Sequence, residues 1–160
     1  TGFFFDYNPG AAVQTLIQFI DATSQLLLNG ATLHASGTGL LLTKGSMIAQ
    51  GNSVVSCNNQ INIGDGIGAD DFAVTIAGGA QLNFLQGLLN YENVNAASWF
   101  MENSVSILDM SSNTTLALYQ TMNLESGVAV FENNSTLARV PAATLDGSIT
   151  ALGSVFFEII

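Results

Sequence analysis

The chain has 160 residues, of which only 9% are charged, and its twelve acidic and two basic side chains give a net charge of −10. Two cations, Lys44 and Arg139, cannot neutralise the several phosphates that a nucleic-acid site requires. The mean hydropathy is +0.41, yet no apolar run approaches the ~18 residues of a membrane-spanning helix. The composition therefore argues against nucleic-acid binding and a membrane span. It favours one domain whose apolar residues fill a core and subunit contacts. The alternative is a monomer whose surface is rich in Asn, Ser, Thr and Gln.

Residues 1–10 are the first expected element, an aromatic terminal strand or arm that ends in Asn8-Pro9-Gly10. Asn is a good N-cap and Pro is tolerated in the first helical turn, so a helix is expected next. Apolar residues then recur at helical spacing, at Val13, Leu16, Ile17 and Ile20. This pattern predicts an amphipathic helix over residues 11–21 that caps the first repeat.

From residue 24 to residue 160, the chain repeats a small turn followed by alternating apolar and polar residues. The phrase occupies residues 29–35, 44–49, 78–84, 102–108, 125–131 and 146–152, and its last four starts are 24, 23 and 21 residues apart. Near-constant spacing is typical of a solenoid, in which each rung buries its apolar face against its neighbours. We therefore predict a single all-β domain, a right-handed parallel β-helix of about six rungs over residues 24–160. The alternative is a two-sheet sandwich of the self-assembling pilin kind.

One interval breaks the spacing, because 34 residues separate Gly45 from Gly79. The gap predicts either two short rungs or one rung with a projecting loop around residues 57–71. We favour the loop, and insertions in solenoids often meet a ligand. Within it, residues 65–72 approximate a calcium-binding nonapeptide, with glycines that free carbonyl groups and carboxylates that supply hard oxygen ligands. The candidate metal ligands are Asp65, Asp70 and Asp71, and Ca²⁺ is the one candidate cofactor. The alternative is a solvated acidic loop.

The segment 153–160 predicts a final strand that is rich in aromatic and β-branched residues and has no polar cap after it. An exposed strand edge of this kind recruits another strand. Either the chain is cut from a longer one, or the last rung accepts the first strand of the next copy. The second interpretation predicts a subunit contact made by Phe3, Phe4, Phe5, Tyr7, Phe156, Phe157, Ile159 and Ile160.

Residues suited to catalysis are sparse. The cations are far apart, His34 is alone in an alternating strand, and Asp70-Asp71 has no basic cluster beside it. A glycoside hydrolase needs two carboxylates roughly 5–9.5 Å apart, and a lyase needs a basic proton acceptor. We predict that the chain is not an enzyme. The single cysteine, Cys57, excludes an intramolecular disulfide.

Three F-x-x-N tetrapeptides begin at Phe5, Phe100 and Phe131, and one Gly-Gly-Ala-Gln begins at Gly78. These motifs resemble the FxxN and GGA[ILV] repeats of chlamydial-type polymorphic outer-membrane proteins. The passengers of those autotransporters are surface β-helices used in adhesion. The resemblance therefore implies an extracellular or cell-surface β-helix.

Two functions are consistent with these observations. The first is a structural subunit that joins head-to-tail with copies of itself into an extracellular filament or surface layer. The alternative is an adhesin or spike-type binding module that meets a surface glycan or receptor through the loop at 57–71.

Overall fold

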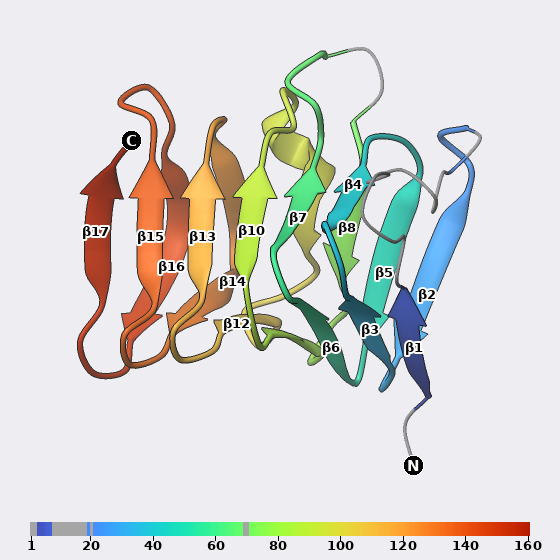
Figure 1. Cartoon of the computed structure of the whole chain (residues 1–160), viewed down its shortest axis with the longest axis horizontal. Helices are drawn as coiled ribbons and strands as arrows, with labels where there is room; N and C mark the ends of the chain where they lie inside the picture. The colour runs from blue at the N-terminus through green and yellow to red at the C-terminus, as the bar shows by residue number, and fades with distance from the viewer. Residues whose placement is uncertain (1–2, 8–18, 20, 69–70) are drawn as a thin grey trace.

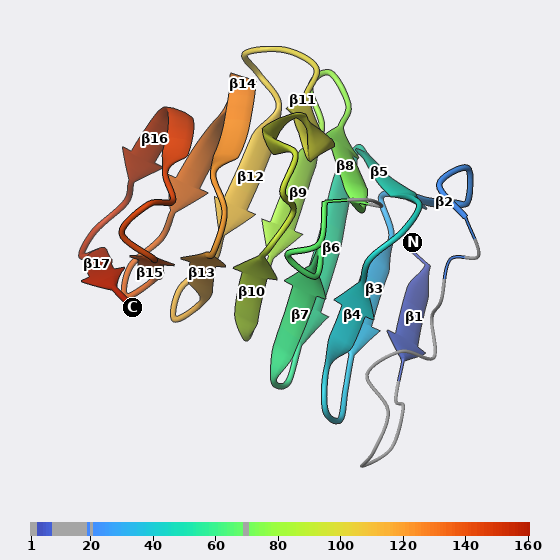
Figure 2. The ribbon, with the colours of Figure 1, turned by 90° about the horizontal axis from the view of Figure 1, so that it is seen from above.

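A computed structural model describes residues 3–7, 19, 21–68 and 71–160 of the chain. Within these ranges the regular elements are strands, apart from one 3₁₀ turn at Ala96–Ser98. The strands form three parallel sheets around a common core (Figures 1 and 2). None of the described residues belongs to a helix long and apolar enough to cross a bilayer.

The three sheets, named A, B and C here, differ in the number of strands that they contain. Sheet A has seven strands, in the spatial order β1 (Phe4–Tyr7), β3 (Thr32–Ala35), β6 (Asn52–Cys57), β9 (Gln81–Phe84), β12 (Ile107–Met110), β14 (Met122–Phe131) and β16 (Leu145–Ala151). Sheet B has four, β2 (Gln25–Asn29), β5 (Ser46–Gln50), β8 (Ala73–Ile76) and β11 (Trp99–Met101). Sheet C has six, β4 (Leu40–Leu42), β7 (Gln60–Ile63), β10 (Leu88–Tyr91), β13 (Thr115–Leu118), β15 (Thr136–Arg139) and β17 (Phe156–Ile159).

From β2 to β13, successive strands visit sheets B, A and C in turn, so that β2, β3 and β4 make one rung and β5, β6 and β7 make the next. After β13, the described strands alternate between sheets A and C, because sheet B ends at β11. Each strand pairs in parallel with its counterpart one rung later, as in the register Leu33↔Val55. This all-β arrangement is compatible with a parallel β-solenoid. The sandwich alternative is wrong, because sandwiches are built from antiparallel sheets and every described strand pair is parallel.

The repeated phrase marks one corner of the rung, the turn from sheet B into sheet A. The copies at 29, 78 and 102 lead into β3, β9 and β12, whereas those at 125 and 146 begin inside the longer strands β14 and β16, and the copy at 125 coincides with the register shift of β14. The copy at Lys44 leads instead into β5 of sheet B, and the sheet A entry of that rung starts at Gln50. The 34-residue interval was therefore measured between turns at two different corners of the rung, one before β5 and one before β9.

This corner is closed by left-handed backbone and buried hydroxyl groups. Gly51 has φ +59 and Gly79 has φ +75, which suit glycine because it has no Cβ. The buried Ser53 hydroxyl donates to Leu28 O at 3.0 Å, and Ser106 donates to Ala77 O at 2.9 Å. Each hydroxyl thus bonds a carbonyl of an earlier strand or turn, which fixes one rung on another.

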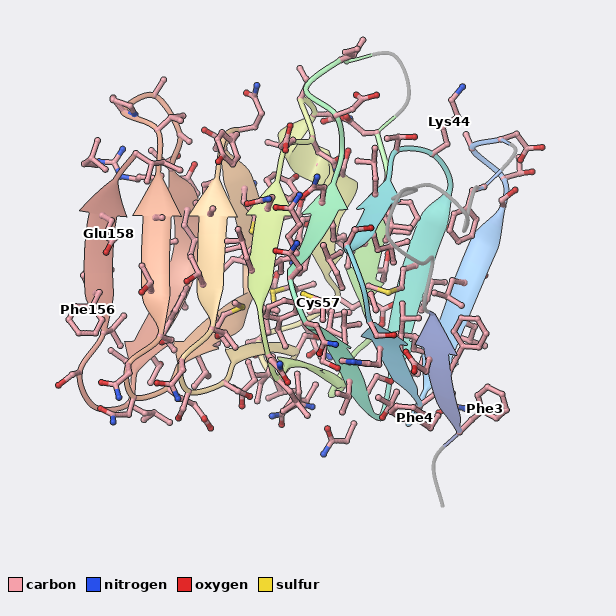
Figure 3. The ribbon with its side chains drawn as sticks, in the orientation of Figure 1. Phe3, Phe4, Lys44, Cys57, Phe156 and Glu158 are labelled. Atoms are coloured by element: carbon pink, nitrogen blue, oxygen red, sulfur yellow. The ribbon has the colours of Figure 1, made fainter. Side chains whose placement is uncertain are left out.

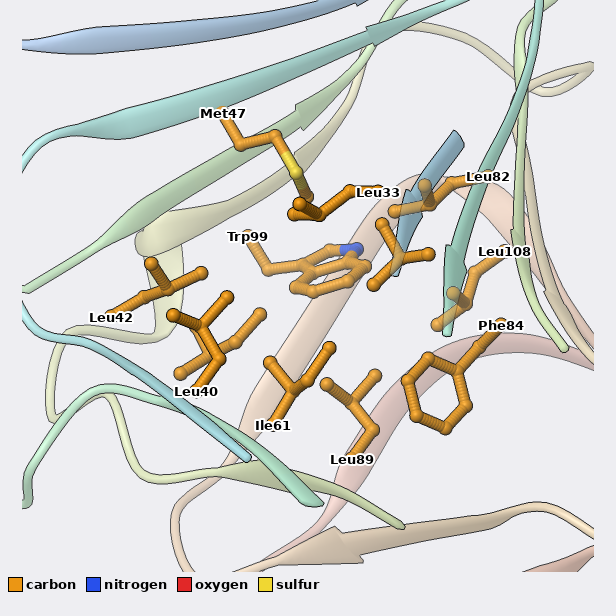
Figure 4. Close-up of a pocket in the computed structure, with 12 residues that line it drawn as sticks. Leu33, Leu40, Leu42, Met47, Ile61, Leu82, Phe84, Leu89, Trp99 and Leu108 are labelled. Atoms are coloured by element: carbon orange, nitrogen blue, oxygen red, sulfur yellow. The ribbon is translucent and has the colours of Figure 1, made fainter. Parts of the chain in front are cut away.

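The core lies between the sheets, where alternate residues of each strand face inward. Phe131, Trp99, Met101 and Leu108 are among its fully buried side chains. A cavity of about 20 Å³ remains beside Trp99 (Figure 4). It is lined by apolar side chains, and Trp99 Nε1 has no hydrogen-bond partner.

Two expectations about the chain's course need comment. The capping helix over 11–21 lies almost wholly outside the described residues; of its span, Phe19 and Asp21 are described, and neither is helical. The loop expected at 57–71 is wrong in extent, because β7 occupies Gln60–Ile63 as a regular strand of sheet C. The segment that leaves the sheets follows Ile63 and returns at Ala73.

Candidate functional site

The C-terminal rung, formed by β16 and the final strand β17, is open on its far side. Neither strand has a further neighbour among the described residues (Figure 1). Its apolar side chains are exposed, with 68% of Phe157, 62% of Ile159 and 41% of Ile149 accessible to solvent. We call residues that pair in register across successive strands of one sheet a column. Phe157, Ile159 and Ile149 face inward, because they continue the inward columns of Leu137, Arg139 and Ala129.

The preceding rung shows what this exposure means. Leu137 pairs in register with Phe157 and is only 6% exposed, and Phe131, which pairs with Ala151, is fully buried. The chain continues the apolar column into the last rung, where no described residue covers it. Among the described residues, the last rung therefore exposes the apolar columns that the earlier rungs bury.

Arg139 lies just below this surface, at an inward position where earlier rungs carry Leu118 and Tyr91. Its Nη1 donates to the carbonyls of Pro141 at 3.0 Å and Ala143 at 2.9 Å. These bonds satisfy part of a charged group placed among apolar side chains. A hollow of about 280 Å³ lies beside it, lined by Leu137, Arg139, Phe157, Glu158 and Ile159.

The N-terminal end presents an aromatic edge, the strand β1 (Figure 3). Phe3 and Phe5 line a pocket of about 420 Å³ with Leu26 and Leu33, so their rings face the core. Phe4 faces outward, and its ring stacks on His34 with centroids 6.3 Å apart. The backbone of Tyr7 pairs with Ala35, which completes the register of β1 on β3.

The expected contact residues are thus separated in two ways. Phe3, Phe4 and Phe5 lie at one end of the stack, and Phe156, Phe157, Ile159 and Ile160 lie at the other (Figure 3). They also belong to different sheets, because β1 is in sheet A and β17 is in sheet C. The sheet A strand at the C-terminal end is β16, whose Ile149 and Ala151 the sequence reasoning missed. The last copy of the repeated phrase, at 146–152, was the signal that could have identified them.

The acidic segment is part of a second layer of loops outside the sheets. Asp71 accepts hydrogen bonds from Val94 N at 3.1 Å, Asn95 N at 2.6 Å and Ser98 Oγ at 3.2 Å. Beside it, the buried amide of Asn93 accepts from Phe72 N and donates to Phe72 O. These bonds join the loop before β8 to the loop before β11.

Of the three candidate calcium ligands, Asp65 accepts from Ile67 N at 2.9 Å, and Asp70 lies outside the described residues. Within the described ranges, no three His, Cys, Asp or Glu residues gather as a metal site would require. Burial, and then the nearby Asp65 carboxylate, raise the pKa of Glu92. The calcium hypothesis stays a prediction, and the contacts that Asp71 makes are those of a loop clamp.

A polar column crosses the outer face of sheet A through Asp6, His34 and Ser56, which occupy adjacent strands in register. His34 Nδ1 lies 2.7 Å from Ser56 Oγ, while Asp6 Oδ1 accepts from Ser36 Oγ at 2.9 Å. Among the described residues, no hydrogen bond joins Asp6 to His34. The column is therefore a set of separate cross-strand bonds and lacks the Asp–His link of a catalytic triad.

A second polar group lies farther along the same face. Gln81 Nε2 donates to Asn83 Oδ1 at 2.6 Å and to Asp109 Oδ2 at 3.0 Å, and Asn83 Nδ2 donates to Asn52 Oδ1. Asp109 Oδ1 is buried without a partner. Burial, and then the Glu132 carboxylate, raise the pKa of Asp109.

Cys57 is fully buried in the core, and burial raises the pKa of its thiol to about 11. Its Sγ lies 3.6 Å from Gln86 O. A protonated thiol shielded from solvent is a poor nucleophile.

No family model, curated protein or solved structure matches this chain. The F-x-x-N motifs do not share one place in the rung. Phe5 and Phe131 occupy one inward column of sheet A, whereas Phe100 is exposed in sheet B. The resemblance to polymorphic outer-membrane proteins stays an expectation from sequence.

Proposed function

We propose that this chain is a structural, self-assembling subunit of an extracellular filament or surface layer, joined head-to-tail through its terminal strands. The observation that carries the proposal is the open C-terminal rung, where the inward residues Ile149, Phe157 and Ile159 are exposed. Burial of apolar surface is favourable by about 25 cal/mol per Å², so covering this end with another chain stabilises an assembly. The proposal assigns no catalytic activity to the chain.

The edges of β16 and β17 support the same proposal. An edge strand presents unpaired N–H and C=O groups, and these groups template the addition of another strand. The two strands carry few charges to oppose it, since Asp146 and Glu158 are their ionisable residues. We propose in addition that the coil is right-handed, because parallel crossover connections adopt that hand in about 98% of cases.

The test is a pair of substitutions at adjacent residues of β17, one whose side chain faces the core and one whose side chain faces outward. Phe157 faces inward, beside Leu137 in register, and Phe156 faces outward, beside Thr136. Phe157→Lys places a charge in the exposed apolar column and is expected to leave single chains of 16.7 kDa. Phe156→Lys adds the same charge on the outer face and should leave assembly largely intact, which differs from the expectation from sequence that Phe156 belongs to the contact.

Light scattering and electron microscopy over a range of concentrations supply the readout. The unsubstituted protein should grow in mass with concentration and form regular stacks. If it remains a single chain at every concentration, the assembly function is overturned.

A second candidate, a binding module of adhesin or spike type, is favoured by the loop layer. Ile67 and Val94 are exposed on it, and the Asp71 bonds hold the two loops together. Screening the chain against surface glycans and receptor ectodomains, with Ile67→Asp as the comparison, tests this role. Binding that survives Ile67→Asp unchanged would contradict a role for the loop layer.

A further inference from the structure

We propose that the incoming copy docks its first strand, β1, in parallel on β16, and so continues sheet A from one subunit into the next. This inference rests on the proposed head-to-tail assembly and gives it a register. It differs from the expectation that β1 meets β17, because β17 belongs to sheet C.

The columns of sheet A determine the register. One outward column runs from Phe4 through the sheet to Thr150 of β16, and the adjacent inward column runs from Phe5 to Ala151. Stacking a second copy with its sheets aligned extends both columns by one strand. Phe4 of the incoming copy then lies beside Thr150, and its Phe5 lies over Ala151.

The side-chain sizes fit this register. Phe5 is 46% exposed at the N-terminal end, and Ala151 is a small, exposed residue at the C-terminal end. A large ring over a small side chain fills space without overpacking, which close-packed interiors require. Phe3 also faces the core, and it meets the exposed Ile149 in the same stack.

The position of β1 also favours sheet A. Sheet A extends one strand farther than sheet C at the N-terminal end, because β1 lies beyond β3 while β4 is the edge of sheet C. β1 is therefore the outermost strand of the incoming copy and is the first to reach the other subunit. Docking β1 on β17 would instead place the incoming sheet A on sheet C, so the sheet C strands of the incoming copy would no longer continue β17.

Tail-to-tail pairing is disfavoured by charge. It would bring two open C-terminal rungs together, and each carries the exposed carboxylates of Asp146 and Glu158. Like charges at one interface oppose association. Head-to-tail docking instead places each of these rungs against the aromatic edge of β1.

Cysteine crosslinking tests the register. Neighbouring strands lie about 4.8 Å apart, within reach of a short thiol crosslinker, so Phe4→Cys with Thr150→Cys should link successive copies. The two positions lie at opposite ends of one chain, which prevents an internal link (Figure 2). Cys57 does not compete, because it is fully buried and its pKa is raised to about 11.

Three further chains are controls. Phe4→Cys with Glu158→Cys reports docking on β17, Thr150→Cys alone reports tail-to-tail contact, and Phe5→Cys with Ala151→Cys repeats the test in the inward column. We expect ladders of covalent multimers from the two sheet A pairs, and little product from the other two chains.

The outcomes separate this inference from the function on which it rests. Assembly by light scattering with crosslinking through Glu158→Cys, or through Thr150→Cys alone, overturns the β1–β16 register and leaves self-assembly standing. Single chains at every concentration overturn self-assembly itself, and the register with it.

Discussion

The two ends of the stack differ in how completely their apolar columns are covered. At the N-terminal end, Leu28, Leu40 and Leu42 of sheets B and C are closed, with 5%, 1% and 3% exposed, whereas Phe3 and Phe5 of β1 in sheet A are 72% and 46% exposed. Phe19 packs against the core, with its ring 5.4 Å from that of Phe72 in the loop before β8. At the C-terminal end, Phe157 is 68% exposed in a column that is otherwise buried.

The comparison teaches that the alternating pattern propagates a rung but does not terminate the stack. The same apolar alternation gives a buried residue at Leu137, which β17 covers, and an exposed one at Phe157, which no described strand covers. What covers an end must come from outside the repeat, either from a different segment or from another chain.

The largest expected effect comes from removing a buried aromatic ring, and it is compared with the removal of an exposed ring in the last rung. Phe131 is fully buried, so Phe131→Ala should lower the free energy of unfolding by about 3–5 kcal/mol through lost burial and a residual cavity. Phe157→Ala, in the open rung, should cost less than about 1 kcal/mol in the dissociated chain. Urea unfolding at concentrations where scattering shows single chains measures both.

An equal loss from the two substitutions would contradict the comparison, because it would mean that Phe157 is covered in the isolated chain. A small loss at Phe157 that grows with protein concentration would sharpen the comparison. It would show that the ring becomes buried only when a second copy docks.

The second expected effect concerns the loop layer, in which Asp71 holds the loop before β8 against the loop before β11. Asp71→Ala removes the acceptor for two backbone amides and one hydroxyl, and should cost about 1–3 kcal/mol. Asp65→Ala removes a single exposed bond to Ile67 N and should cost less than about 1 kcal/mol. Thermal unfolding ranks the two variants, and hydrogen exchange at Val94 and Asn95 shows whether the layer has opened.

The prediction for Asp71 fails if exchange at those two amides is unchanged. In that case the loops are held by other contacts, such as the Asn93 amide bonded to Phe72.

The smallest expected effect is a pH dependence at Asp109 on the outer face of sheet A. Its folded-state pKa is raised above the ordinary value of 3.8 by burial and then by Glu132, so the folded chain binds the proton more readily than the unfolded chain. This contribution to stability is present below pH 3.8 and is lost as the pH rises through the folded-state pKa. At pH 7 the ionised carboxylate therefore lowers stability.

Asp109→Asn should consequently raise the melting temperature at pH 7, by an amount that shrinks as the pH approaches 4. The amide keeps an oxygen acceptor for Gln81 Nε2, which isolates the effect of charge. A melting temperature that falls at pH 7 would show that the carboxylate stabilises the face in its ionised form.

Much of the strand content could be predicted from local pattern. The alternation at Ala31, Leu33 and Ala35 placed β3 with the correct side inward, because the side-chain period of a strand is two. The turn phrases beginning at 78 and 102 precede strands of sheet A, β9 and β12, while those beginning at 125 and 146 fall within β14 and β16 of the same sheet. These are short-range features, set by which residues tolerate a turn and which prefer burial.

The sheet that follows the second copy of the repeated phrase, at residues 44–49, could not be predicted in the same way. Lys44-Gly45-Ser46 looks like the other turns, yet it opens sheet B, because the three corners of a rung use similar turn residues. A pattern that is alike at different corners identifies a turn without saying which sheet follows. Because of this ambiguity, the loop expected at 57–71 was placed over residues that form β7.

The candidate contact surface was also predictable from local sequence only in part. The sequence by itself determined that the chain alternates for burial in strands, that it is poor in charge, and that apolar strands lie near both termini, because these properties are written in neighbouring residues. Only the tertiary structure decided that β1 and β16 share a sheet while β17 belongs to another, and that Phe157 is exposed where Leu137 is buried. The physical reason is that the sheet that a strand joins depends on the summed length of all the turns and strands before it, and its exposure depends on whether another strand follows.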